Sequence, residues 1–335
     1  MKRALRNFFV AAAGLALIAA CGGSSDDSGG LTGDIPTSEP ATITTQNAPL
    51  IAGVVAEVAM GQGVFSSIFS PAIPIASSGA DAAIAPVMKP VLSAALKKAA
   101  PAQLYATSGG REDCAVSGTV DVQITVDNPL ELSVNDLFEF QFTDCDDGTG
   151  AVLNGGMSIS ITALTGDPAS GQSLIGMAIE FTAFAVTENG ETSSASGSVS
   201  FEIDMTNPPV TTITVSTNAF VTTTSGTEKV LTSFTIEITE DESMFPVAVT
   251  VDTSFTISSP RIGGEVTVTT TLTLESMGED YPFVGELRIE GADQAVIVMI
   301  ALDANTVRLE IDVDGDGAVD DTVDMSWDEM MAAAA

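Results

Sequence analysis

From about residue 118 to residue 327 the chain alternates apolar and polar residues with a period of two. Val120, Val122 and Ile124 alternate with polar neighbours, and Phe138 to Phe142 repeats the pattern. Similar or β-branched runs occupy 157–161, 199–205 and about 210–222, 229–239, 247–258, 265–275, 283–290, 294–302, 306–313 and 321–327. Because successive side chains of a strand point to opposite faces, each run predicts a strand with one buried face.

The connections between these runs are short and contain turn-forming residues. Ser225-Gly226, Ser259-Pro260 and Gly263-Gly264 separate neighbouring runs, and no helical pattern lies between them. Consecutive strands on short connections form an antiparallel meander. The sequence therefore predicts a mainly β domain over 105–335. Because a dozen or so twisted strands rarely remain one open sheet, we expect a barrel-like, strongly curved sheet or a sandwich.

The segment that precedes the strands, residues 47–104, is rich in alanine and has a helical pattern. Apolar residues recur at helical spacing from Ile51 to Val58, and Pro49 suits a first helical turn. A second candidate helix, near residues 82–100, is interrupted by Pro86 and Pro90. We therefore expect a short helical segment on the N-terminal side of the sheet.

The first twenty residues have the pattern of a signal peptide. A basic start precedes an apolar run from Phe8 to Ala20, which is too short to span a bilayer. Small residues then lead into Cys21, and this resembles the lipobox of bacterial lipoproteins. The resemblance implies removal of residues 1–20 and acylation of Cys21 with palmitate-like chains, whereas the alternative is an ordinary secretory signal.

Residues 21–46 follow as a Gly-, Ser- and Asp-rich stretch that predicts a flexible tether. In the sorting rule that the lipobox resemblance implies, Gly22 rather than aspartate favours delivery to the outer membrane. The expected location is therefore the bacterial cell envelope, on either its periplasmic or its surface side.

Two further cysteines, Cys114 and Cys145, remain in the body of the chain. An even pair in an exported protein predicts a disulfide, and the alternative is two buried thiols. The chain has no histidine, so histidine-based triads and zinc sites are excluded. A formal net charge of −34 repels polyphosphate, so nucleic acid is not an expected partner.

Near the C-terminus, aspartates alternate with glycines in the manner of a calcium loop. Asp312, Asp314, Asp316 and Asp320 offer hard oxygen ligands. Val323 stands where such a loop needs a bidentate carboxylate, and strands rather than helices flank it. We expect either a weak structural calcium site or a solvated acidic hairpin tip, and no other cofactor.

Two acidic clusters, at 144–147 and 240–242, are expected to be solvated charge at turns. A hydrolase that uses carboxylates alone would need two of them at a matched separation in a cleft, and the sequence indicates no such pair. We therefore rank this function third, below the two functions that follow.

The motifs Cys114-x₃-Gly118-Thr119-Val120, Cys145-Asp146-Asp147-Gly148 and the C-terminal acidic hairpin resemble a class of uncharacterised proteobacterial lipoproteins. The resemblance implies an envelope location and no assigned activity. We therefore expect a non-enzymatic envelope protein with a structural or binding role, whose protein partner the sequence does not identify. The alternative is a periplasmic carrier of lipid or another apolar ligand in a curved sheet.

Overall fold

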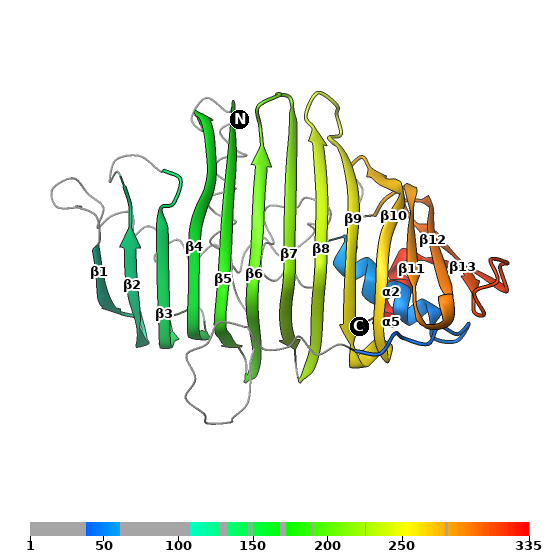
Figure 1. Ribbon diagram of the computed structural model, residues 1–335, viewed down its shortest axis with the longest axis horizontal. Helices are drawn as coiled ribbons and strands as arrows, with labels where there is room; N and C mark the ends of the chain where they lie inside the picture. Colours follow the sequence, from blue (N-terminus) through cyan, green and yellow to red (C-terminus); the bar gives the residue numbers. More distant parts are fainter. Residues whose placement is uncertain are drawn as a thin grey trace.

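A computed structural model describes most of the chain after residue 37 (Figure 1). The described residues are 38–60, 108–127, 133–146, 148, 150–167, 172–188, 190–224, 226–278 and 281–334. The signal peptide, Cys21 and the second candidate helix, near residues 82–100, lie outside them.

The described strands form one antiparallel sheet in which each strand pairs with the next along the chain, from β1 at one edge to β14 at the other (Figure 1). The strands are β1 (Ser108–Asp113), β2 (Ser117–Thr125), β3 (Leu137–Asp146), β4 (Ala151–Asp167), β5 (Gln172–Glu188), β6 (Glu191–Asp204), β7 (Val210–Thr224), β8 (Thr227–Asp241), β9 (Ala248–Ser259), β10 (Gly264–Ser276), β11 (Val284–Glu290), β12 (Val296–Asp303), β13 (Thr306–Asp312) and β14 (Asp321–Ser326). The prediction of a mainly β antiparallel meander is confirmed.

The prediction of a barrel-like, strongly curved sheet or a sandwich was wrong. The strand order is linear, and β1 and β14 pair with one neighbour each, so the sheet neither closes nor divides into two. Charges on the two edge strands oppose edge-to-edge pairing: β1 carries Arg111, Glu112 and Asp113, and β14 carries Asp321 and Asp324. The sheet adjusts by twisting, and β10–β13 turn out of the plane of the other strands (Figure 1).

The two faces of the sheet differ sharply in polarity. One face is mainly apolar, and its phenylalanines form a chain of ring contacts across β3 to β7. Phe142 meets Phe184 at 5.8 Å between ring centroids, and Phe181 lies between Phe184 and Phe220 at 5.9 and 5.7 Å. Phe142, Phe184 and Phe220 are at most 2% exposed. The other face carries mainly Ser, Thr, Asp and Glu, as the alternation predicts.

β-Bulges interrupt the alternation at nearly the same level in several neighbouring strands. The register shifts between Phe142 and Cys145 in β3, and between Phe181 and Phe184 in β5. At each bulge one residue has a positive φ, as Ala183 does at 46°, and the side chains change face afterwards. This change of phase explains why the sequence pattern missed β5. The short edge strand β1, which contains two glycines, was also missed.

Two helices cover the apolar face at the C-terminal end of the sheet (Figure 1). The predicted helix is present as α2 (Ala48–Ala59), and α5 (Trp327–Ala334), which the sequence analysis missed, packs against it. A Cβ on Gly53 would clash with the carbonyl oxygen of Met330 in α5. The absence of a side chain at residue 53 therefore allows the two helices to cross closely. Among the described residues, no helix has the length and apolarity that crossing a membrane requires.

The α2 helix is fixed to the sheet by apolar contacts and by one ion pair. Its side chains from Ile51 to Val58 are fully buried, apart from Glu57. The Glu57 carboxylate accepts a hydrogen bond from the Lys229 ammonium group of β8 at 2.9 Å. Residues 39–43, which fall in the expected tether, also contact the sheet: the Ala41 N–H donates to the Glu265 carbonyl.

Candidate functional site

The disulfide predicted between Cys114 and Cys145 is present, with 5.4 Å between the two Cα atoms. Cys114 directly follows β1, and Cys145 lies near the end of β3. The bond therefore ties the edge of the sheet to its third strand and closes a segment in which the cysteines are 31 positions apart. Cys21, the predicted lipidation residue, lies outside the described residues.

The acidic loop between β13 and β14 is ordered by its own backbone. The buried Asp312 carboxylate accepts hydrogen bonds from the N–H groups of Gly315 and Gly317, at 2.8 and 2.9 Å. At the other end, Asp320 accepts one from the Val313 N–H at 2.9 Å. These bonds hold the loop as a hairpin tip between strands, and Val323 belongs to β14.

Gly315 is required where it stands. Its φ is 72°, in the left-handed region, and an added Cβ would meet the Asp293 carbonyl oxygen at 2.7 Å. Gly317 has a similar φ of 85°, but nothing lies within 4 Å of its Cβ position. The loop is thus packed against residues 293–294 at one glycine and open at the other.

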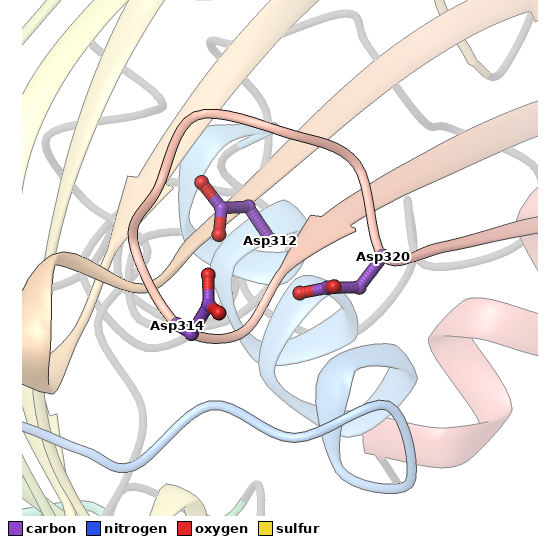
Figure 2. A group of neighbouring side chains, drawn as sticks. All are labelled: Asp312, Asp314 and Asp320. Atoms are coloured by element: carbon purple, nitrogen blue, oxygen red, sulfur yellow. The ribbon is translucent and has the colours of Figure 1, made fainter.

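Three of the four predicted aspartates gather inside this loop (Figure 2). Asp312, Asp314 and Asp320 each offer one carboxylate oxygen, and these oxygens lie within 4.8 Å of one another. The fourth, Asp316, is not in the group, and its carboxylate accepts a hydrogen bond from the Ala318 N–H at 2.7 Å. Three carboxylates at this separation could hold a metal ion.

A second site, which the sequence analysis missed, is a groove on the polar face over β1 to β5. It has a volume of about 640 Å³. Its polar lining comes from Arg111, Asp121, Gln123, Glu139, Gln141, Ser158, Glu180 and Thr182, and its floor includes Gly109, Gly110 and Gly156. The signal in the sequence is the presence of glycines inside otherwise regular strands, which marks positions where side chains are absent from a sheet face.

The acidic cluster at 240–242 differs from the expected solvated charge, because one of its carboxylates is half-buried. Glu240 continues the row of Ile236 and Ile238 on the apolar face and is half-buried at the end of β8. Burial, together with the nearby charge of Glu242, raises its pKa to about 7. Asp241 is different: hydrogen bonds from the Ser243 side chain and backbone lower the pKa of its carboxyl.

Comparisons with protein-family models, with curated proteins and with solved structures found no match to this chain.

Proposed function

We propose that this chain is a lipid-anchored, non-enzymatic protein of the bacterial cell envelope, in which the long sheet is a platform for binding. The observation that carries the proposal is the Cys114–Cys145 disulfide. The chain has three cysteines, so this bond leaves Cys21 as the cysteine without an internal partner, directly after an apolar segment. Disulfides persist mainly in oxidising compartments, which supports export.

The arrangement of the sheet supports a binding role. One face is polar and carries a groove, whereas the apolar face is buried within the protein. The long strands β4 to β9 make the polar face broad, and broad polar surfaces suit contacts with ligands or neighbouring envelope components. On this proposal the tether holds the body off the outer membrane, and two or more acyl chains on Cys21 provide durable anchoring.

The anchor is tested by comparing Cys21→Ser with the double variant Cys114→Ser/Cys145→Ser in cells fed labelled palmitate. We expect Cys21→Ser to lose the label and leave the membrane fraction. The double variant removes the disulfide but keeps the anchor, so it should remain labelled and membrane-bound. Labelling of Cys21→Ser at the level of the natural chain would contradict the proposal.

The alternative function is a carrier of lipid or another apolar ligand, and the length of the apolar face favours it. Side chains along that face, including Ile179, Phe220 and Ile236, are at most 1% exposed in the chain alone. A ligand would have to displace contacts that the protein already makes. Organic extraction of the purified chain followed by mass spectrometry decides: stoichiometric lipid supports the carrier, and its absence supports the platform.

We also propose that the Asp312–Asp320 loop binds calcium weakly, because hard carboxylate oxygens suit this ion. The test variant is Asp314→Asn, and Asp316→Asn is the control because its carboxylate lies outside the cluster. Calcium should raise the melting temperature of the natural chain and of Asp316→Asn, but not of Asp314→Asn. EGTA should reverse the rise, and an equal response of both variants would refute the site.

A further inference from the structure

The groove on the polar face is built from two rows of side chains that run across β1 to β5 and therefore lie side by side. The register pairs place Gly109, Gln123, Glu139, Ser158 and Glu180 in one row. They place Arg111, Asp121, Gln141, Gly156 and Thr182 in the other. Neighbouring members of a row are about 4.8 Å apart, the distance between paired strands.

Two glycines make the hollow: Gly109 at the β1 end of the first row, and Gly156, next to the last position of the second row. Gly109 and Gly156 contribute no side chain to the polar face, where their neighbours carry Gln, Glu or Thr. A Cβ on Gly156 would lie 3.1 Å from Oε1 of Gln141, so even an alanine would begin to fill the groove. The depression therefore follows from residue type and does not depend on a mobile side chain.

The charges in the groove are unbalanced. Three carboxylates, from Asp121, Glu139 and Glu180, face one guanidinium group. Arg111 approaches Asp121 at 3.4 Å, whereas Glu139 and Glu180 make no ion pair within the part of the chain that the structure describes. Among the described residues the groove thus offers two carboxylates without an ion-pair partner, on alternate positions of one row, with Ser158 between them.

The chemistry of the lining narrows the class of ligand. The three carboxylates do not converge as those of Asp312, Asp314 and Asp320 do, so they are not arranged around a single metal ion. Phe140, the one aromatic residue of the lining, has its side chain buried on the opposite face, so no ring is available for stacking on a sugar. An anionic ligand is repelled by the chain, whose formal net charge is −34.

We propose that this groove binds linear polyamines, in which ammonium groups are joined by short methylene chains. Ammonium groups would contact Glu139 and Glu180 in charge-assisted hydrogen bonds, and the amides and hydroxyls of the rows would accept the remaining N–H groups. Glu139 and Glu180 lie two strand spacings apart, about 9.6 Å, which exceeds one short methylene linker and is comparable with the span of a triamine in which two such linkers join three nitrogens. This inference names a ligand for the proposed platform and rests on that function.

The test is calorimetric titration of spermidine into the purified full-length chain at low and physiological salt. The groove variant is Glu139→Gln/Glu180→Gln. The control, Glu202→Gln/Glu237→Gln, removes the same charge from exposed positions of the polar face on β6 and β8, outside the groove. We expect saturable binding to one site, weakened about tenfold in the groove variant and less than about twofold in the control.

Equal weakening in both variants would show that spermidine only collects around an acidic protein, and this would overturn the proposal. Heat changes without saturation in the natural chain would overturn it as well. Both variants replace exposed or half-exposed carboxylates with amides of the same shape, so melting temperatures close to that of the natural chain are expected and are checked first. A natural chain that is not acylated at Cys21 would refute the anchor without changing this titration, so the two proposals fail separately.

Discussion

Replacing Glu240 should stabilise the protein at alkaline pH and have little effect at pH 4. Glu240 is half-buried on the apolar face of β8, opposite Val249 of β9. Its pKa rises from 4.5 to about 7, chiefly because burial disfavours the charged carboxylate. The folded state therefore binds this proton more tightly than the unfolded state does.

The sign and size of the effect follow from linkage. The stabilisation from this proton is complete below pH 4.5 and is lost as the pH rises to about 7. At about 1.4 kcal/mol for each pH unit of this window, the natural chain loses at most about 3.5 kcal/mol. Solvent screening of the half-buried group reduces this value. Glu240→Gln mimics the protonated acid and should recover the loss at pH 8.

The assay is urea denaturation of the natural chain and of Glu240→Gln at pH 4, below the window, and at pH 8, above it. The control is Glu237→Gln, which removes the same charge from an exposed position on the polar face of the same strand. We expect Glu240→Gln to gain stability at pH 8 only, and Glu237→Gln to change by less than about 0.5 kcal/mol at both. Equal gains in the two variants would refute the reasoning, because general charge repulsion would then explain both.

Three further predictions concern the covalent link and the two close approaches of the backbone. Cys114→Ser/Cys145→Ser should lower the free energy of unfolding by about 4 kcal/mol, since the bond closes a loop across 31 positions, and an unchanged urea midpoint would contradict this. Gly53→Ala should be destabilising by about 1–3 kcal/mol although alanine favours helices, because its Cβ would strike the Met330 carbonyl of α5; a rise in melting temperature would show that the helices separate at no cost. Gly315→Ala should cost more than Gly317→Ala, because both have a positive φ but only residue 315 meets a neighbouring backbone, and thermal melts that rank them in the opposite order would count against the loop geometry.

Local pattern was sufficient to predict most strands. The runs predicted at about 229–239 and 265–275 correspond to β8 (Thr227–Asp241) and β10 (Gly264–Ser276), because buried residues alternate with exposed ones over part of each strand, from Phe234 to Ile238 and from Val266 to Thr269. β5 was not predicted, because the bulge at Ala183 moves its buried apolar residues from odd to even positions. Such a change of phase shortens the alternating run that a periodicity count can use. β8 has a similar bulge at Ser233 and was still predicted, because its alternation continues from Phe234 to Ile238.

The missed helix α5 did have a signal in the sequence. Ser326 and Glu329 form a capping box, in which the Glu329 carboxylate accepts from the Ser326 N–H at 2.9 Å and the Glu329 N–H donates to the Ser326 hydroxyl at 3.1 Å. The Glu329 carboxylate accepts from both the N–H and the hydroxyl of Ser326, and these two bonds lower the pKa of its carboxyl. The run of methionines and alanines that follows consists of strong helix formers.

Long-range arrangement was beyond the reach of local pattern. Whether β1 meets β14 depends on twist accumulated over the whole sheet and on edge charges, so an open sheet could not be distinguished from a barrel. Of the four loop aspartates, Asp316 has the same spacing as the others, and only the path of the backbone directs it away from the cluster. The groove was missed for the same reason, because its two rows join residues from five strands.

The most direct test of the account is mass spectrometry of the N-terminal peptide of the mature protein, purified from its native membrane. We expect a peptide that begins at Cys21 and carries a diacylglyceryl group on the thiol. A peptide that begins at Met1, or one that contains Cys21 with an unmodified thiol, would contradict it.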